Sequence, residues 1–241
     1  MRKLKIDHCK LKIGRAGGAE WGLRCPRKLL AVLLAAFGLA TGVFAQDAKP
    51  LYENNFEQAA LDKVPDDFLV LDGGFAVKED GGNKFLELPG APLETFGTLF
   101  GPTEGTGLAV TARIHGTGKG RRLPAFAVGL NGVGGFRLQV SAAKKLLELY
   151  KGDEVVASAP FAWESDSWTL LRLQVRKAKD GAWKVEGSAW KQGTAEPKAW
   201  AIAHDEKSEL SAGRASVWGN PFSGTPIRFD DLAVSRAKDQ P

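Results

Sequence analysis

The chain has 241 residues and a formal net charge of +5, but the charge is distributed unevenly. Residues 1–45 carry 9 of the 33 Lys and Arg residues and only 2 of the 28 Asp and Glu residues, so residues 46–241 hold 24 basic and 26 acidic side chains. This balance excludes the strongly basic surface that attracts nucleic acid or an anionic membrane, and we expect neither as a partner.

The first 45 residues have the features of an export signal. A basic flank precedes an apolar run from Leu29 to Ala45, and small residues stand at Val43 and Ala45. The run is shorter than the about 20 apolar residues of a membrane-spanning helix, so an uncleaved anchor is the weaker alternative. We expect cleavage after Ala45, a mature protein that starts at Gln46, and a secreted or periplasmic location.

Both cysteines, Cys9 and Cys25, precede the expected cleavage site. The mature protein then has no disulfide and no thiol chemistry. Its 196 residues are enough to bury one sizeable core, and no internal repeat or low-complexity linker divides them. We therefore predict one domain over residues 46–241.

Short segments of alternating apolar and polar residues run through this domain, separated by turns rich in Gly, Asn, Asp and Pro. No segment has the pattern of a convincing amphipathic helix. The spacing predicts an all-β fold, an antiparallel jelly-roll sandwich of two sheets. The predicted strands are 51–56, 75–79, 84–88, 107–115, 125–131, 135–141, 145–151, 154–159, 167–177, 182–192, 199–203, 213–219 and 226–235.

The hairpin formed by 167–177 and 182–192 can be predicted with its register. A three-residue loop, 179–181, sets Val175 opposite Val185 and Leu173 opposite Gly187, so that the apolar faces of the two strands match. A two-residue loop would instead place a charged side chain opposite an apolar one.

The other face of this hairpin is polar and carries an aromatic side chain. If strands 107–115 and 135–141 join the same sheet, its outer face gathers planar hydrogen-bonding groups beside indole rings. Such a surface suits sugars, whose hydroxyls need donors and acceptors and whose C–H faces stack on aromatic rings. The alternative is a solvated sheet face stabilised by cross-strand pairs. The candidate ligand-binding residues are Arg113, Arg137, Gln139, Trp168, Arg172, Gln174, Glu186 and Trp190.

The other tryptophans of the mature chain differ in their expected positions. Trp183 falls on the core side of its hairpin and Trp218 follows Val217 at a strand end, and both are expected to have packing roles. Trp163 and Trp200, like Trp168, stand at strand entrances, where loops meet and ligands are often held.

The sequence contains no recognisable catalytic motif. A retaining glucanase needs carboxylates about 5 Å apart on one face of a strand, and no such string of three acids occurs. Glu164 and Asp166 have the spacing for one face, but they lie in an expected turn. Gly-x-Ser-x-Gly and His-Glu-x-x-His are absent as well.

The order of several segments resembles a known family. The opening "LYENNFEQAALDKVPDDFLVLDGGFAV", then "GNKFLELPG", "GAWKVEGSAW", "EPKAW" and the closing "GTPIRFDDLAVS" resemble secreted jelly-roll domains of the concanavalin A-like lectin/glucanase superfamily, LamG-like domains among them. The resemblance spans nearly all of residues 51–235. It implies that the first and last strands lie side by side, and that a structural calcium ion is bound by Glu57 and Asp230.

The adjacent carboxylates Asp230 and Asp231 raise a related question. Strict alternation directs one of them inward unless a β-bulge intervenes, and a carboxylate out of water needs a hydrogen bond, an ion pair or a metal. Calcium, which prefers six to eight oxygen ligands, would satisfy it. The alternatives are two exposed carboxylates at a strand end, or a pair with Arg228 or Arg236.

Taken together, the sequence favours an exported β-sandwich that binds a polysaccharide or other glycan without catalysis. The alternatives are a glycan hydrolase or lyase of the same fold with an unfamiliar site, and a structural surface protein that binds another protein.

Overall fold

The structure is a computed structural model of the chain, and it describes residues 49–90, 94–105, 107–178 and 181–237. The expected signal segment, 1–45, lies outside the described residues. None of the described residues belongs to a helix of the length and apolar character needed to cross a membrane.

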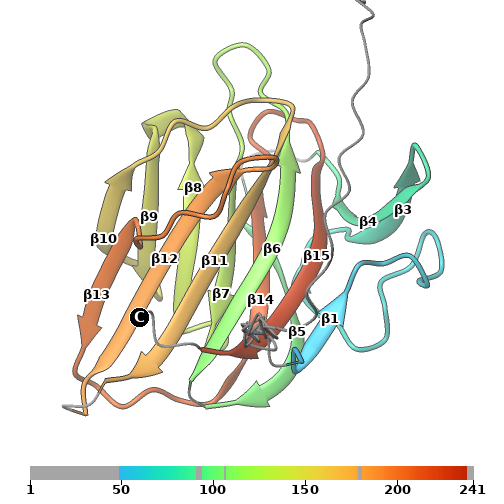
Figure 1. Cartoon of the computed structure of the whole chain (residues 1–241). Coiled ribbons are helices and arrows are strands. Elements are labelled where there is room, and N and C mark those ends of the chain that lie inside the picture. Colours follow the sequence, from blue (N-terminus) through green and yellow to red (C-terminus); the bar gives the residue numbers. More distant parts are fainter. Residues whose placement is uncertain (1–48, 91–93, 106, 179–180, 238–241) are drawn as a thin grey trace, which may run out of the picture. The chain divides into compact units, whose positions relative to one another are not determined.

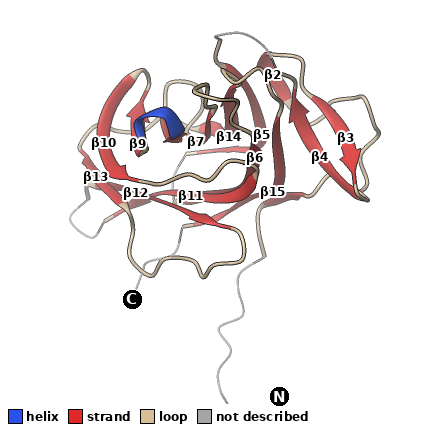
Figure 2. Ribbon diagram, turned by 90° about the horizontal axis from the view of Figure 1, so that it is seen from above, coloured by secondary structure: helices blue, strands red, loops and turns tan. Residues whose placement is uncertain are grey.

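Two antiparallel sheets pack face to face as a β-sandwich, as Figure 1 and Figure 2 show, and the all-β prediction is confirmed. Sheet A has the order β13-β12-β11-β6-β15-β4-β3, with β1 also paired to β15, and sheet B has the order β10-β9-β8-β7-β14-β5-β2. The strands of sheet A are β1 (Tyr52–Asn54), β3 (Ala76–Asp80), β4 (Asn83–Leu88), β6 (Leu108–Gly116), β11 (Ser167–Lys177), β12 (Trp183–Lys191), β13 (Ile202–Glu206) and β15 (Ile227–Arg236). Those of sheet B are β2 (Leu69–Asp72), β5 (Phe96–Glu104), β7 (Ala125–Leu130), β8 (Phe136–Ser141), β9 (Leu146–Lys151), β10 (Glu154–Pro160) and β14 (Gly213–Asn220), and a 3-10 turn, η1 (Ala142–Lys144), joins β8 to β9.

The core lies between the two sheets and is built from the apolar positions that alternate along each strand. Leu138 of β8 and Gly187 of β12 show how closely the sheets approach, because a Cβ atom on Gly187 would lie 2.7 Å from a methyl carbon of Leu138. A bulkier residue at Gly187 would therefore force the sheets apart.

The predicted β11–β12 hairpin is confirmed residue by residue. Val175 pairs with Val185 and Leu173 with Gly187. The backbone N–H of Ala178 donates to the carbonyl of Ala182, 2.8 Å away, which closes the three-residue loop, and Gly181 has φ +87°. The apolar face of this hairpin is buried, including Trp183, as predicted.

The first and last strands lie side by side, as the resemblance implies. β1 pairs with the second half of β15, with Glu53 opposite Ala233 and Asn54 opposite Leu232. The first half of β15 pairs along the same edge with β4. In Figure 1, β15 accordingly has β6 on one side and β1 on the other. Along this edge of β15 the neighbouring strand therefore changes from β4 to β1 between Phe229 and Leu232.

Two strands of the structure were not predicted from the sequence, and a third begins later than predicted. Residues 96–104 form β5, which lies between β14 and the short edge strand β2 in sheet B, although Gly101 and Pro102 are typical of a turn. β5 contains Gly97, Gly101 and Pro102, residues that are uncommon in strands, and for this reason it was not predicted. Gly101 has φ +71° and lies beside a register shift. β13 begins at Ile202, three residues after the predicted start of this strand at residue 199.

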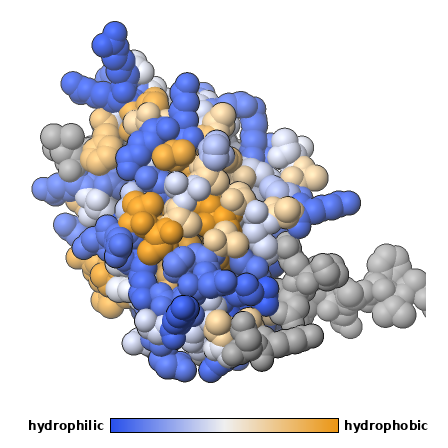
Figure 3. Space-filling view, turned by 90° about the vertical axis from the view of Figure 1, so that its left-hand side faces the viewer, coloured by the Kyte–Doolittle hydropathy of each residue, from blue (hydrophilic) through white to orange (hydrophobic). Residues whose placement is uncertain are grey.

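One side of the sandwich carries the edge strands β10 and β13. Figure 3 shows hydrophobic side chains reaching the surface there, surrounded by hydrophilic ones. Val155 is 42% exposed, while Ala157, Ala159 and Phe161 are partly buried against the core. These residues close the open side of the sandwich between its two sheets.

Candidate functional site

The eight predicted ligand-binding residues do not share one face. β8 pairs with β7 and β9 in sheet B, whereas β6, β11 and β12 are neighbours in sheet A. Arg137 and Gln139 therefore lie on the outer face of sheet B, and the expectation that they join the other residues is wrong. Alternation along a strand defines its two faces but not the sheet to which the strand belongs.

A loop covers part of the predicted platform on sheet A. Residues 192–201, between β12 and β13, cross the outer face of the sheet in front of β11 and β12 in Figure 1 and below them in Figure 2. Arg172 donates to Glu196 over 2.7 Å and lies 5.4 Å from the centre of the Trp200 ring. Ser188 accepts a hydrogen bond from the backbone N–H of Ala201. This part of the sheet A face is packed rather than open.

Gln174 and Glu186 are buried, at 0% and 7% exposed, although they point to the outer face. Gln174 donates to the Glu186 carboxylate over 2.7 Å, and Arg176 pairs with the same carboxylate at 2.9 Å. Burial by itself would raise the pKa of Glu186, but the hydrogen bonds from Arg176 and Gln174 outweigh it and lower the pKa. The hydrogen-bonding groups of Gln174 and Glu186 are therefore used within the protein and are not available to a ligand at the surface.

A hollow of about 260 Å³ remains on sheet A beside Trp190. Arg113, Glu196 and Asp231 line it, but Arg113 is paired with Asp230 and Asp231, and Glu196 is paired with Arg172. Trp168 is stacked by the Arg113 guanidinium, 4.3 Å from the ring centre. The charged groups of this hollow therefore have partners within the protein.

A second pocket, of about 280 Å³, lies on the outer face of sheet B. We call it the sheet B pocket. It is lined by Thr95, Leu123, Pro124, Ala125, Arg137, Gln139, Ser141, Ala142, Ala143, Lys144, Tyr150, Asn220 and Phe222. Two predicted residues, Arg137 and Gln139, thus line this pocket together with side chains that the sequence analysis did not single out.

Trp218, which was expected to have a packing role at a strand end, lies beside this pocket, because β14 directs it to the outer face of sheet B. It is half-buried, whereas its neighbours Val217 and Gly219 face the core. The ring lies along the sheet over Gly97, where a Cβ atom would be only 2.4 Å from the indole. Its Nε1–H donates to Ser216 Oγ over 2.8 Å. The alternation of Val217 and Gly219 with Ser216 and Trp218 carried the signal for this orientation.

Arg137 lies between two aromatic rings. Its guanidinium carbon is 4.8 Å from the ring centre of Tyr150 and 5.3 Å from that of Trp218. Tyr150 lies opposite Arg137 on β9, and Gly129 lies opposite it on β7. Gly129 has no room for a side chain, because a Cβ atom would lie 2.4 Å from Ser216 Oγ. Gly129 therefore makes room for the Ser216 hydroxyl, which accepts the hydrogen bond from the Trp218 indole.

Glu148 lies under the edge of the pocket and is 4% exposed. Its carboxylate accepts hydrogen bonds from Ser141, from Lys144 at 2.9 Å and from the Tyr150 hydroxyl at 3.1 Å. Burial would raise its pKa, but these hydrogen bonds outweigh burial and lower it. Glu148 therefore stays ionised near neutral pH and holds Lys144 and Tyr150 in place.

Two amides complete the polar part of the pocket. Gln139 donates to Ser141 Oγ over 2.9 Å, and Asn220 donates to Thr95 Oγ1. Planar amides and a guanidinium beside aromatic rings present donors, acceptors and flat apolar surfaces together, which is the combination that a sugar ring needs.

Asp230 and Asp231 are separated by a β-bulge at the point where the edge of β15 changes partner. The register shifts between Asp230 and Ala233, and Asp231 has φ +48°. Asp230 is 1% exposed, whereas the Asp231 side chain is 57% exposed. One carboxylate therefore does point inward, and the bulge carries the other into solvent.

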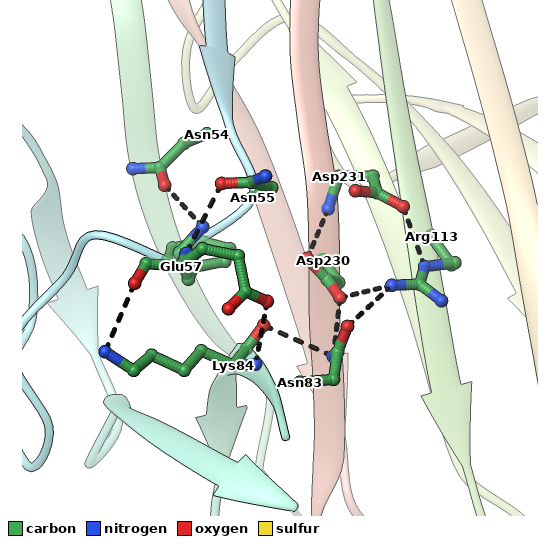
Figure 4. Close-up of polar contacts among 9 residues, drawn as sticks. Asn54, Asn55, Glu57, Asn83, Lys84, Arg113, Asp230 and Asp231 are labelled. Carbon is green, nitrogen blue, oxygen red and sulfur yellow. Dashed lines mark hydrogen bonds and ion pairs between the residues drawn. The ribbon is translucent and has the colours of Figure 1, made fainter. Parts of the chain in front are cut away.

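Arg113 is the partner of Asp230, and neither Arg228 nor Arg236 is. Figure 4 shows the Arg113 guanidinium beside the carboxylates of Asp230 and Asp231, and Asn83 donates to Asp230 over 2.9 Å. Burial raises the pKa of Asp230, and the hydrogen bonds from Asn83 and from the Asp231 backbone N–H oppose this.

The calcium site expected at Glu57 and Asp230 does not fit these surroundings. The Glu57 carboxylate accepts a hydrogen bond from the Lys84 backbone N–H at 3.1 Å, and the Lys84 ammonium lies 3.2 Å from the Glu57 carbonyl oxygen. The Asp230 carboxylate is already paired with the Arg113 guanidinium. The Arg113 guanidinium thus stands beside Asp230 where a divalent ion would have to bind, and the described residues hold no cluster of three or more His, Cys, Asp or Glu suited to a metal.

We therefore expect a chelator to leave thermal stability unchanged. Adding excess EDTA to the purified protein should not move the melting temperature, because Asp230 already has a fixed cationic partner. A calcium-dependent melting temperature would contradict this, because an ion held at 100 times its Kd stabilises the folded state by about 2.7 kcal/mol.

The acidic pair in the turn before β11 has local partners. Glu164 pairs with Lys191, and Asp166 lies 3.3 Å from His115, with side chains 62% and 77% exposed. The prediction that both lie in a solvated turn is confirmed.

No protein-family model matches the chain, and no curated protein matches it either. Solved structures do share the fold. A Bacillus subtilis protein of unknown function with a galectin-like fold has a TM-score of 0.55 at 13% identity, over 78% of this chain and 96% of that one. The potassium-bound carbohydrate recognition domain of Emp46p has a TM-score of 0.52 at 13% identity, over 74% and 95% of the chains.

A third match comes from work on endo-acting O-glycanases that prominent members of the human gut microbiota express to initiate mucin breakdown. It has a TM-score of 0.52 at 11% identity, over 79% of this chain and 100% of that one. At such low identities the matches establish the fold alone. The chain therefore has the β-sandwich fold of these structures, one of which is a carbohydrate recognition domain. The Emp46p domain has been solved in both potassium-bound and metal-free forms.

Proposed function

We propose that this protein is exported and binds a glycan without catalysis, through the sheet B pocket. The observation that carries the proposal is the grouping of Trp218, Arg137 and Tyr150 beside a hollow of about 280 Å³ that also holds Gln139 and Asn220. The rings supply stacking surface for sugar C–H groups, and the amides and guanidinium supply directional hydrogen bonds to hydroxyls.

The sheet B pocket supports this proposal better than the sheet A platform does. On sheet A, Gln174 and Glu186 are buried, and Arg172 is paired with Glu196 of the loop 192–201. On sheet B, Gly97 lets the Trp218 ring lie against the sheet, and both Trp218 and Tyr150 remain partly exposed. The lectin-like fold of the solved neighbours is consistent with a ligand of this class.

Binding without turnover is favoured over hydrolysis by the charges of the pocket. A two-carboxylate mechanism needs a pair of acids about 5 to 10 Å apart and a general acid whose pKa is raised. No carboxylate belongs to the described lining of the sheet B pocket, and Glu148 beneath it has a lowered pKa. Release of reducing ends from a polysaccharide by the purified protein would favour the hydrolase alternative.

The matched pair Trp218→Ala and Trp190→Ala tests the location of the site. Each variant removes one half-buried indole from an outer face, one from sheet B and one from sheet A. On a glycan array followed by calorimetry with the strongest hit, Trp218→Ala should weaken binding about tenfold or more, as expected for a central aromatic contact. Trp190→Ala should bind like the unaltered protein.

A filling variant separates loss of the site from loss of the fold. Ala143 lines the pocket and is exposed on η1, so Ala143→Trp adds bulk without removing a contact. It should reduce glycan binding while the melting temperature stays the same. Binding that survives both Trp218→Ala and Ala143→Trp but is lost in Trp190→Ala would move the site to sheet A. A flat array together with a tight protein partner would favour the protein-interaction alternative.

A further inference from the structure

Arg137 differs from the other arginines on the strands that the structure describes. Five of these form ion pairs with carboxylates, namely Arg113, Arg172, Arg176, Arg228 and Arg236. Arg214 donates to the backbone carbonyls of Gly101 and Asp67. Arg137 forms neither kind of contact within the described part of the chain. Its partners are the faces of two aromatic rings.

The residues around Arg137 fix its guanidinium in place but do not neutralise its positive charge. Its Nε–H is buried and has no hydrogen-bond acceptor. Burial lowers the pKa of its guanidinium, and Asp153 opposes this effect from beyond ion-pair distance. A guanidinium that has lost part of its hydration gains most from a bidentate anion, because fork-to-fork hydrogen bonds replace the lost water.

The rest of the pocket offers Arg137 no competing anion. Among the described lining residues Lys144 is the other cation, and it is paired with Glu148 at 2.9 Å. That carboxylate also accepts hydrogen bonds from Ser141 and the Tyr150 hydroxyl, so its oxygens are directed to those groups. The charge balance of the site therefore leaves one unit of positive charge at Arg137.

We propose that the glycan bound at the sheet B pocket carries an anionic group, a uronate carboxylate or a sulfate ester, that pairs with Arg137. This inference rests on the proposed function and specifies the ligand class for the same site. The sugar ring that bears the anion stacks on Trp218, and Gln139 and Asn220 bind its hydroxyls. The rings of Tyr150 and Trp218 fix the guanidinium plane, so the anion is received in a defined orientation.

The test compares acidic and neutral polysaccharides on the unaltered protein. The acidic probes are polygalacturonate, alginate, hyaluronan and chondroitin sulfate, and the neutral probes are dextran, xylan and a mixed-linkage β-glucan. Each acidic polymer that binds is then carboxyl-reduced or desulfated, which removes the charge and keeps the backbone. We expect binding of at least one acidic polymer, a tenfold or greater loss after neutralisation, and weaker binding at high salt. Whether reduction or desulfation abolishes binding distinguishes a carboxylate from a sulfate.

Variants at Arg137 and at a control arginine outside the pocket complete the test. Arg137→Gln should lose the preference for acidic over neutralised polymer, and Arg137→Lys should retain part of it, because a lysine keeps the charge but not the fork. Arg172→Gln, which removes a cation paired with Glu196 on sheet A, outside the sheet B pocket, should keep the preference. The melting temperature of each variant shows whether it is folded, and the Arg137→Lys variant keeps the test decisive if Arg137→Gln is unstable.

The outcomes separate this inference from the function on which it rests. Equal binding of neutral and acidic polymers, with no change in preference in Arg137→Gln, overturns the anionic ligand and leaves glycan binding intact. Binding to none of the polymers and to no glycan of an array overturns glycan binding, and the anionic ligand with it. A preference for acidic polymers that Arg137→Gln preserves overturns the assignment to Arg137.

Discussion

Replacing Arg113 by leucine should lower the free energy of unfolding by about 3 kcal/mol or more, the cost of removing one partner of a buried ion pair. Asp230 is 1% exposed and would keep Asn83 and the Asp231 backbone N–H as hydrogen-bond donors, but no cation. The penalty arises mainly from the charge left behind, since Arg113 itself is partly exposed.

The Arg113→Leu variant has a pH signature that a packing defect would not have. Without the guanidinium the pKa of the folded Asp230, already raised by burial, rises further above its unfolded value. A raised folded pKa means that stability from this group is present at low pH and is lost as the pH rises through that pKa. The deficit of Arg113→Leu should therefore shrink as the pH falls from neutrality.

Urea unfolding of the variants at several pH values measures both effects. In a double variant, Asp230→Asn should recover much of the loss caused by Arg113→Leu, because the buried charge is gone. Arg172→Leu is the matched control, since its pair with Glu196 is more exposed, and it should cost about 1 kcal/mol or less. A deficit that is independent of pH and persists in the double variant would refute the role given to Asp230.

Phe229→Ala should have an effect of similar size, about 3 to 5 kcal/mol, through the core. Phe229 directly precedes Asp230 on β15, is 0% exposed, and lies 6.1 Å from Phe75 between ring centres. Its ring also reaches β14 of the opposite sheet, where a Cβ atom on Gly219 would lie 3.4 Å from it. Truncation would open a cavity between the sheets.

Phe222→Ala is the matched control for this prediction. Phe222 is 37% exposed on the rim of the sheet B pocket, so its loss should change stability by within about 0.5 kcal/mol. Calorimetric melting of the two variants gives the comparison. Equal losses of stability would contradict the assignment of Phe229 to the core.

The sequence was sufficient for features that depend on local pattern. The β11–β12 register follows from matching Val175 with Val185 and from the turn chemistry of Gly181, because a shift by one residue would turn every side chain to the other face. The pairing of the first and last strands came from the family resemblance instead. That prediction did not depend on the identity of any residue at the contact between the two strands.

Features that depend on long-range pairing could not be predicted in this way. The alternation in β8 shows that Arg137 and Gln139 share a face, but only the pairing with β7 and β9 assigns that face to sheet B. β5 was hidden because Gly97 and Gly101, which resemble turn residues, are required by the Trp218 ring and by a bulge. The partner of Asp230 was missed because Arg113 lies 117 residues away on β6.

The location of the ligand is the central claim, and NMR of the tryptophan indoles tests it most directly. Trp218 donates its indole N–H to Ser216 on the outer face of sheet B, whereas Trp190 lies on sheet A. Titration of the 15N-labelled protein with a glycan that binds it, with signals assigned from Trp218→Phe and Trp190→Phe variants, should shift the Trp218 indole resonance and leave that of Trp190 in place. A shift of the Trp190 signal with an unchanged Trp218 signal would contradict the sheet B pocket as the site.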